Sequence, residues 1–462
     1  MKGIGGLGRL GQRVGQPVGR WLTWMVVGVT LSWLMSCGLP GGAGADDNAL
    51  EFWTMQLQPK FTDYFEALID EFEGSHPGVE VKWLDVPWSA MESKILTAVS
   101  AGTAPDVVNL NPTFASKLAQ RNAWLELGDR LDPRTRQSYL DNIWQAAKLE
   151  NKSFALPWYL TTRLTIFNKD LLAEAGIEQP PTTYGELAEM AEQVREKTGK
   201  YAFFVTFVPD DSGEVLESLV QMGVTLVDDQ GKAAFDSPEG RAAFEFWVNL
   251  YKDGLLPKES LTQGHRRAID LYQGGQTAIL SSSPEFMGAI ATNAPTVAAV
   301  SEAAPQVSGK TGKVSAAMMT LVVPKKTNKP DLATEFAAFV TNSANQLAFA
   351  KAAHVLPSQK TALATLRDDL KAAVDEAIAG DSTDSEDSEG TAGTARGTTE
   401  AKLVQARQLS AEQLTKADVL LPPIKNIKLL QSVIYENLQA AMLDEKTVEE
   451  AITDAAADWN RG

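Results

Sequence analysis

The chain has 462 residues, 44% of them hydrophobic, and carries 42 Lys and Arg against 59 Asp and Glu, a formal net charge of −17. This length suffices for about two domains with substantial cores. The acidic balance excludes nucleic acid and broad anionic membrane surfaces as general partners, because phosphates are neutralised by clusters of Lys and Arg. A single cysteine excludes an internal disulfide, so the fold depends on its hydrophobic cores.

The first 36 residues have the pattern of a removable export signal. Four basic residues form the leader: Lys2, Arg9, Arg13 and Arg20. The apolar run Trp21–Met35 that follows has 15 residues, fewer than the ~20 that a membrane-spanning helix needs. We therefore predict a signal peptide over residues 1–36 and a Gly-rich tether over residues 37–49.

The run Leu34-Met35-Ser36-Cys37 resembles the lipobox of bacterial lipoprotein precursors. The resemblance implies cleavage before Cys37 and attachment of acyl chains to its thiol, which would hold the protein at the membrane. The mature chain would have 462 − 36 = 426 residues and a net charge of −17 − 4 = −21. The alternative is a buried cysteine after an N-terminal anchor helix, but no stop-transfer charges follow.

Strands and helices alternate in the first part of the chain. Glu51–Leu57, Val79–Trp83 and Val107–Leu110 have strand patterns, and apolar residues at helical spacing lie between them, over 61–72 and 91–99. This order predicts a mostly parallel sheet covered by helices on both faces.

The same alternation resumes near Pro157. Thr183 and Glu186 form a capping-box signature at the start of a helix. The other predicted helices cover Val215–Met222, Pro238–Asp253, 332–340 and Lys446–Trp459, and the predicted strands are Leu164–Phe167, Phe203–Val208, Ala278–Leu280 and Met318–Val323.

Residues 379–400 interrupt the pattern, because acids occur there among Ser, Thr and Gly without a large apolar residue. We predict an acidic disordered insert. Calcium binding is the alternative, but the acids lack the spacing of a known calcium loop.

Several segments share their order and spacing with one family. The most specific are Ala155–Pro157, Leu164–Leu172, Gly176 and Pro181–Leu187, and the others are Gly102–Val108, Gly274–Ala278 and Thr447–Ala451. Together they resemble the extracellular solute-binding proteins of sugar-type ABC importers, which include maltose- and trehalose-binding proteins. The resemblance covers nearly all of Glu51–Trp459.

This resemblance implies the α/β, two-lobed periplasmic-binding-protein fold, in which each lobe is a mostly parallel sheet flanked by helices and a hinge joins the lobes. The N-lobe would take residues 50–158 plus 270–355, and the C-lobe residues 159–269 plus 356–462. Ligand would lie between the lobes, beyond the carboxyl ends of the strands.

A sugar site needs flat aromatic side chains and directional polar groups. Such residues follow the predicted strands or lie where the chain enters the second lobe, and the candidates are Trp53, Gln56, Trp88, Asn111, Thr113, Trp158, Tyr159, Thr161, Arg163, Asp211, Glu285 and Phe286. Asp210 lies beside them. Phe286 is the residue nearest to the position at which relatives place a stacking aromatic.

Each candidate has a structural alternative. Core packing is the alternative for Trp53, as it is for Trp83 and Trp247. Arg163 is either a ligand contact, a surface charge or an interlobe ion pair. Relatives often carry an acid near Thr161, and its absence here leaves room for an anionic ligand such as a glycerol phosphodiester, which a guanidinium binds well.

We expect a receptor without catalytic residues, cofactor or metal, since the three His residues show no paired spacing. Its partners would be a small-molecule carbohydrate and the transmembrane subunits of an ABC permease. It would act as a monomer on the outer face of the cytoplasmic membrane, held there by lipid. A secreted glycoside hydrolase with two carboxylates across a cleft, or a sensor that presents its ligand to a receptor, are the alternatives.

Overall fold

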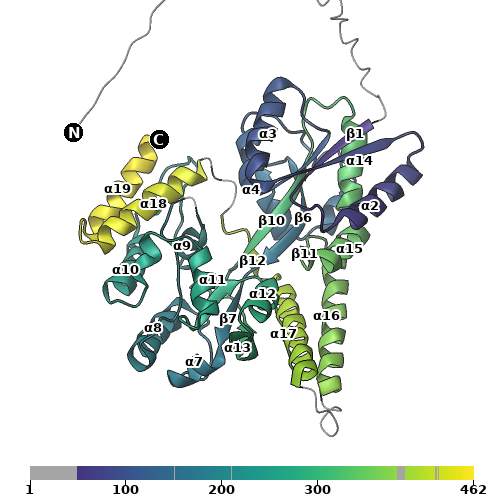
Figure 1. The fold of residues 1–462 in the computed structure, drawn as a ribbon. Coiled ribbons are helices and arrows are strands. Elements are labelled where there is room, and N and C mark those ends of the chain that lie inside the picture. The colour runs from purple at the N-terminus through teal and green to yellow at the C-terminus, as the bar shows by residue number, and fades with distance from the viewer. Residues whose placement is uncertain (1–48, 150, 210, 382–390, 422–423, 425) are drawn as a thin grey trace, which may run out of the picture. The chain divides into compact units, whose positions relative to one another are not determined.

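The computed structural model describes residues 49–149, 151–209, 211–381, 391–421, 424 and 426–462 (Figure 1). The chain divides into two compact units, residues 1–49 and 50–462. Of the first unit only Ala49 is described, so the predicted signal peptide, Cys37 and most of the tether lie outside the described residues. The second unit contains two sheets.

The first sheet has the strand order β11-β6-β10-β3-β1-β2, and β12 pairs with β10. The strands are β1 (Ala49–Met55), β2 (Glu80–Val86), β3 (Val107–Leu110), β6 (Ala155–Thr162), β10 (Val314–Val322), β11 (Leu356–Pro357) and β12 (Ala417–Asp418). Neighbouring residues of β1 enter different cores: Phe52 packs in one hydrophobic cluster and Trp53 in another, because successive side chains of a strand point to opposite faces. The sheet is therefore covered on both sides.

The remaining elements of this first lobe follow the strands. The helices are α2 (Thr62–Ser75), α3 (Trp88–Ala101), α4 (Pro112–Ala119), α5 (Pro133–Ser138), α6 (Asp141–Ala146), α14 (Pro330–Val340) and α15 (Ser343–Ala353), and a small hairpin joins β4 (Lys148–Leu149) to β5 (Lys152–Ser153). Helix α2 buries Phe65, Leu68, Ile69 and Phe72, the stripe that the helical spacing predicted.

The second lobe is built on the sheet β8-β7-β9. Its strands are β7 (Leu164–Asn168), β8 (Ile279–Ser282) and β9 (Ser301–Ala304), and its helices are α7 (Lys169–Glu174), α8 (Tyr184–Thr198), α9 (Glu214–Gln221), α10 (Pro238–Lys252), η1 (Lys258–Leu261), α11 (Arg266–Gln273), α12 (Glu285–Asn293), α13 (Pro295–Ala299), α18 (Ile427–Met442) and α19 (Val448–Arg461). The predicted capping box of Thr183 and Glu186 is present at the start of α8.

The chain passes between the lobes at neighbouring points. Thr162, the last residue of β6 before the chain enters β7, is paired with Ala316 of β10. Val314 at the start of β10 is paired with Ala417 of β12, after which the chain continues toward α18. Three crossing segments therefore lie side by side in one hydrogen-bonded ladder.

Two long helices, α16 (Lys360–Asp381) and α17 (Thr391–Gln413), lie side by side (Figure 1). They enter the predicted disordered insert from both ends, so the prediction of disorder is wrong for 379–381 and 391–400. The Ala-rich sequence before the acidic run favours continuation of α16 up to that run. The centre of the insert, 382–390, lies outside the described residues.

Three further details differ from expectation. Strands β8 and β9 pair with β7, so residues from 270 up to about Ala304 pack in the second lobe and the first lobe resumes at β10. These pairs are antiparallel, as are those of β10 with β3 and β6, so the sheets are less parallel than expected. The predicted strand Phe203–Val208 does not belong to either sheet, and within it the Phe207 N–H donates a hydrogen bond to the Ser260 carbonyl.

Candidate functional site: an interlobe cleft

A cavity of 590 Å³, called here the cleft cavity, is lined by both lobes. The first lobe contributes the first residue of α3, residues that follow β3, and residues of β6 and β10. They are Trp88, Asn111, Pro112, Thr113, Phe114, Tyr159, Thr161 and Ser315–Met319. The second lobe side contributes Asp211, Gly213, Leu216, Glu217, Ile427, Lys428 and Gln431, next to the crossing residues Val419–Leu421. Six of the twelve predicted site residues are thereby brought together: Trp88, Asn111, Thr113, Tyr159, Thr161 and Asp211.

Asn111 and Thr113 reach the cavity because β3 ends at Leu110 and α4 starts immediately after it. The Asn111 Oδ1 accepts a hydrogen bond of 2.9 Å from the Phe114 N–H and so caps α4, and Pro112 occupies the first turn. The cap fixes where Asn111 and Thr113 stand. The sequence predicted these residues just beyond the carboxyl end of a strand, and the turn from β3 into α4 explains that position.

Trp88 supplies an aromatic surface at the rim of the cavity. Its side chain is 45% exposed, and its ring centroid lies 6.4 Å from that of Phe114. Gln56 does not line the cavity, but its Oε1 accepts a hydrogen bond of 3.3 Å from the Trp88 N–H. Gln56 therefore does not contact the cavity itself but helps to fix the start of α3, where Trp88 lies. The exposed indole face is therefore available to pack against an apolar face of a ligand.

Adjacent aromatics on β6 are divided between core and cleft. Trp158 is fully buried, with its ring stacked on Phe349 at a centroid distance of 5.2 Å. Tyr159, the next residue, lines the cleft cavity, and its ring also packs against Phe349 at a centroid distance of 5.3 Å. Burial raises the pKa of Tyr159 above its ordinary value, so its phenol stays protonated and can donate a hydrogen bond.

Arg163 lies behind the cavity and faces carboxylates. Its Nη1 is 3.5 Å from Glu214 Oε1 and 3.8 Å from Glu217 Oε2, and His265 Nδ1 is 3.8 Å from Glu214 Oε2. Burial raises the pKa of Glu217, Arg163 opposes this, and Glu214 adds to it. Arg163 thus forms the ion pair that was one of the alternatives for it, and Glu217 brings a carboxylate to the cleft wall.

Sequence reasoning did not single out Glu214 and Glu217. A signal was present, since two acids three residues apart lie on one face of a helix whose apolar face was recognised. What the sequence could not supply was that this face is turned toward Arg163, because β6 and α9 meet only in the folded protein.

Asp211 is held at the cavity wall by the neighbouring loop. Its Oδ2 accepts a hydrogen bond of 2.6 Å from the His265 N–H. A Cβ added at Gly264 would lie 2.2 Å from Asp211 Oδ1, so a larger residue there would displace the Asp211 carboxylate. Asp210 lies outside the described residues.

Three other predicted residues lie away from the cleft cavity. Trp53 is buried, and the Lys94 ammonium lies 4.6 Å from its ring centroid. Glu285 accepts hydrogen bonds from Arg407 of 2.8 Å and 3.0 Å, and Phe286 packs in the core beside it. Trp53 lies on β1 and the other two on α12, and none of the three is among the residues that line the cleft cavity, so their side chains serve packing and pairing.

Two features bear on metal and membrane. Within the described ranges, no group of three or more His, Cys, Asp or Glu side chains is arranged to hold a metal ion. No helix in that same part of the chain is both long and apolar enough to cross a bilayer.

Comparison with known proteins gives consistent results. The family model described as "bacterial extracellular solute-binding protein" matches residues 58–347. A periplasmic-binding protein of Synechococcus sp. MITs9220, solved in complex with zinc, is 45% identical, with a TM-score of 0.77 and coverage of 89% of this chain and 98% of that one. The cyclic α-maltosyl-1,6-maltose binding protein of Arthrobacter globiformis has a TM-score of 0.71 at 20% identity, over 89% and 98% of the two chains.

Curated relatives are more distant in sequence. The diacetylchitobiose binding protein of Streptomyces coelicolor is 24% identical over 357 residues, 74% of this chain and 81% of that protein. The chain spans 66%, just under two thirds, of the length of the binding proteins of Brucella abortus that it matches at 22% identity.

Proposed function

Because this chain belongs to the bacterial extracellular solute-binding protein family, we propose that it is an exported receptor that binds a carbohydrate in the cleft cavity and delivers it to an ABC permease. The ligand class is an oligosaccharide or a glycosyl polyol. The relatives named above for diacetylchitobiose and for a cyclic maltosyl-maltose support this class. The observation that carries the proposal is the pairing of an exposed indole with polar groups from both lobes around one cavity.

The chemistry of the cavity suits a neutral polyhydroxyl ligand. Trp88 and Phe114 offer apolar faces for sugar CH groups, and Asn111, Thr113 and Thr161 offer directional polar groups. Asp211 and Glu217 can accept hydrogen bonds from sugar hydroxyls. A ligand that contacts both lobes binds the closed arrangement better and so shifts the equilibrium toward it.

Arg163 does not support binding of an anionic ligand. Its guanidinium already faces two carboxylates, and Asp211 and Glu217 add negative charge beside the single Lys428 in the cavity lining. An oxyanion would therefore meet repulsion at the wall where Arg163 was expected to attract it. The hydrolase alternative finds no support among relatives that are binding proteins.

The binding experiment is titration calorimetry on the chain from residue 38 onward, with maltose, trehalose, diacetylchitobiose, glucosylglycerol, a glycerol phosphodiester and an oligopeptide. In a parallel unfolding experiment, a sugar at 100 times its dissociation constant is expected to raise the free energy of unfolding by about 2.7 kcal/mol. Binding of the phosphodiester or the peptide alone would reject the carbohydrate proposal, and release of sugar products would favour the hydrolase.

Anchoring and delivery are tested in cells. We propose that Cys37 carries lipid, so Cys37→Ser should move the protein from the membrane fraction to the soluble extracytoplasmic fraction, with Ser36→Ala as a matched control. Deleting the gene should abolish uptake of the radiolabelled ligand. Normal uptake together with a lost transcriptional response to the ligand would instead favour the sensor.

A further inference from the structure

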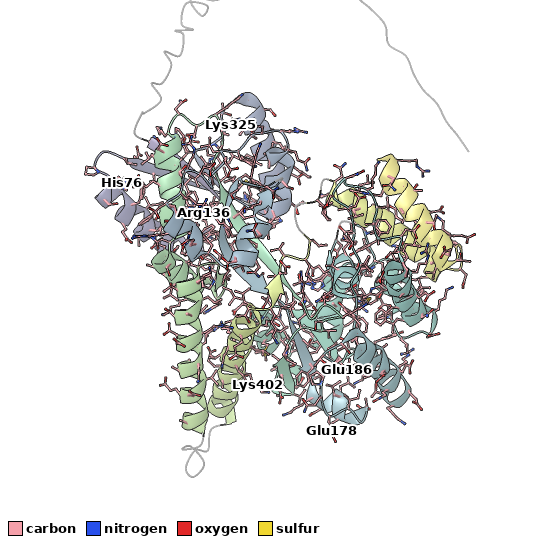
Figure 2. All side chains as sticks on the ribbon, turned by 180° about the vertical axis from the view of Figure 1, so that it is seen from behind. His76, Arg136, Glu178, Glu186, Lys325 and Lys402 are labelled. Carbon is pink, nitrogen blue, oxygen red and sulfur yellow. The ribbon has the colours of Figure 1, made fainter. Side chains whose placement is uncertain are left out.

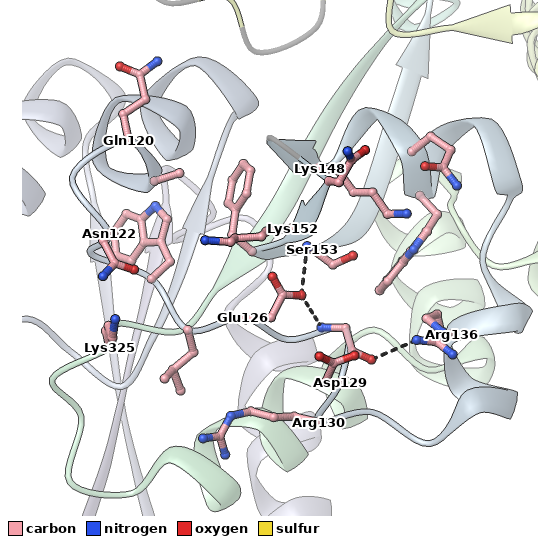
Figure 3. A pocket seen from close by; sticks show the side chains of 18 of the residues that line it. Gln120, Asn122, Glu126, Asp129, Arg130, Arg136, Lys148, Lys152, Ser153 and Lys325 are labelled. Atoms are coloured by element: carbon pink, nitrogen blue, oxygen red, sulfur yellow. Dashed lines mark hydrogen bonds between the residues drawn. The ribbon is translucent and has the colours of Figure 1, made fainter.

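The first lobe carries a second cavity, of 1100 Å³, between the end of α4, the hairpin β4–β5 and α6 (Figure 3). None of its described lining residues lines the cleft cavity. Helix α4 touches both, since Pro112–Phe114 lie at the cleft and Ala119 lies at the second cavity. The proposed sugar-receptor function makes no use of this second cavity.

Basic side chains surround the second cavity. Arg136, Lys148, Lys152 and Lys325 line it, and among the described residues none of the four lies within 4 Å of a carboxylate oxygen. Figure 3 shows Lys148 and Lys152 above Glu126, Arg136 to its right and Lys325 to its left. We call these four residues the basic groove. Figure 2 places Arg136 and Lys325 on the same lobe.

The acids nearby do not neutralise the groove. Asp141 is paired with Lys360 at 2.9 Å, and the fifth cation, Arg130, is paired with Asp331 at 2.8 Å. Glu126 Oε1 accepts hydrogen bonds from the N–H groups of Gly128, at 3.0 Å, and Ser153, at 2.9 Å. Oε1 of Glu126 is therefore satisfied by backbone donors, while its Oε2 is buried without a hydrogen-bond partner among the described residues. Among the described lining residues, the four cations face Glu126 and Asp129, a local excess of 4 − 2 = 2 positive charges in a chain of net charge −17.

A hydrogen bond, a hairpin and buried aromatic residues hold the groove in a defined shape. Arg136 donates a hydrogen bond of 3.2 Å to the Gly128 carbonyl, which orients its guanidinium, and Lys148 and Lys152 lie on the two strands of a short hairpin, paired with Ser153 and Leu149 respectively. Buried aromatics, Trp124, Trp144 and Phe154, form its floor. A fixed guanidinium beside several ammonium groups is the donor set that phosphate and sulfate oxygens prefer.

We propose that the basic groove is a binding site for phosphate- or sulfate-bearing ligands, separate from the sugar cleft. Several cations with few acids between them favour an anion that carries more than one charge. The volume exceeds that of a single phosphate ion and admits an ester with an organic group lying over the aromatic floor. A soluble phosphate or sulfate ester and an anionic lipid headgroup share this chemistry.

The test uses the chain from residue 38 onward, titrated with inorganic pyrophosphate, glucose 1-phosphate and a sulfated disaccharide, and mixed with vesicles of phosphatidylglycerol or of phosphatidylcholine. The groove variant is Lys148→Gln/Lys152→Gln/Lys325→Gln. The matched control is Lys232→Gln/Lys258→Gln/Lys310→Gln, which removes the same charge from exposed positions of the second lobe. Melting temperatures verify that both variants are folded.

We expect the groove variant to lose about tenfold or more in affinity for at least one phosphate or sulfate probe, and the control to stay within about twofold. Loss confined to phosphatidylglycerol vesicles identifies a headgroup, and loss with the soluble probes identifies a free ester. Equal losses in both variants, or no binding of any probe by the unmodified chain, would overturn the proposal.

The two proposals fail independently. Sugar titration of the groove variant should be unchanged, and Trp88→Ala should leave the binding of the phosphate and sulfate probes unchanged. Competition between sugar and pyrophosphate for one site would contradict a separate groove.

Discussion

The guanidinium Nη1 of Arg163 lies 3.5 Å from Oε1 of Glu214, and it faces Glu217 as well. Behind the cleft wall, to which Glu217 contributes a carboxylate, an acid pair therefore surrounds one cation where the chain passes from β6 to β7. This arrangement fixes both the charge that a ligand meets and the way in which the wall responds to pH.

Glu217→Gln should flatten the pH dependence of stability. Because the folded-state pKa of Glu217 is raised above 4.5, the folded protein holds this proton more tightly than the unfolded chain does. Its contribution to the unfolding free energy is fully present at low pH and is lost as pH rises from 4.5 through the folded pKa. Denaturant titrations across this range, with the exposed Glu376→Gln as control, measure the effect. A pH profile of Glu217→Gln parallel to that of the unmodified chain would contradict it.

Trp88→Ala should weaken sugar binding by about 1–2 kcal/mol, roughly tenfold or somewhat more, because it removes an aromatic face at the rim of the cavity. The indole is 45% exposed, so the unfolding free energy should change by less than about 0.5 kcal/mol. Calorimetry and thermal unfolding separate the two effects. Leu443→Ala, an equally exposed apolar truncation outside the cavity lining, should leave sugar affinity unchanged.

Trp158→Ala should lower the unfolding free energy by about 3–5 kcal/mol, because it empties a fully buried site between Phe65 and Phe349. Trp158→Phe should cost much less. It keeps an aromatic ring and removes an indole N–H that is buried and has no hydrogen-bond partner among the described residues. Urea denaturation measures both variants, and equal costs would show that ring packing does not determine the stability of this core.

Glu285→Gln should lower stability without changing sugar affinity. Glu285 and Arg407 form a bidentate pair between α12 and α17, away from the cleft cavity. Arg407 is 15% exposed and Glu285 39% exposed, so solvent screening limits the expected coupling to about 1 kcal/mol. A double-mutant cycle with Arg407→Gln gives this coupling directly. A loss of sugar affinity in Glu285→Gln would place the carboxylate in the site after all.

Local patterns predicted the local structure well. The capping box of Thr183 and Glu186 is present, and so is the stripe of α2, because hydrogen bonds to adjacent residues and helical periodicity depend on a few neighbouring positions. The two-lobed fold followed from the family resemblance and is confirmed by the relatives found for the chain.

Long-range contacts could not be predicted in the same way. That Tyr159 lines the cavity while Trp158 is fully buried depends on distant contacts, because both rings pack against Phe349, which lies 190 positions beyond Tyr159 in the chain. Glu285 was assigned to the cleft because its sequence position suited it, but Arg407 lies on a helix that was partly taken for disordered chain. Sequence reasoning found chemically suitable residues and could not decide which of them share a cavity.

The ladder of crossing segments limits how the two lobes can rearrange. Thr162 is bonded to β10, and β10 is bonded to β12, so none of the three connections can twist without carrying the other two. Swivelling about a single backbone bond is thereby suppressed, and bending across the ladder is the motion left open. If the lobes close on ligand as the proposed function requires, the same rims would meet at each closure, and a permease would encounter one reproducible surface instead of many.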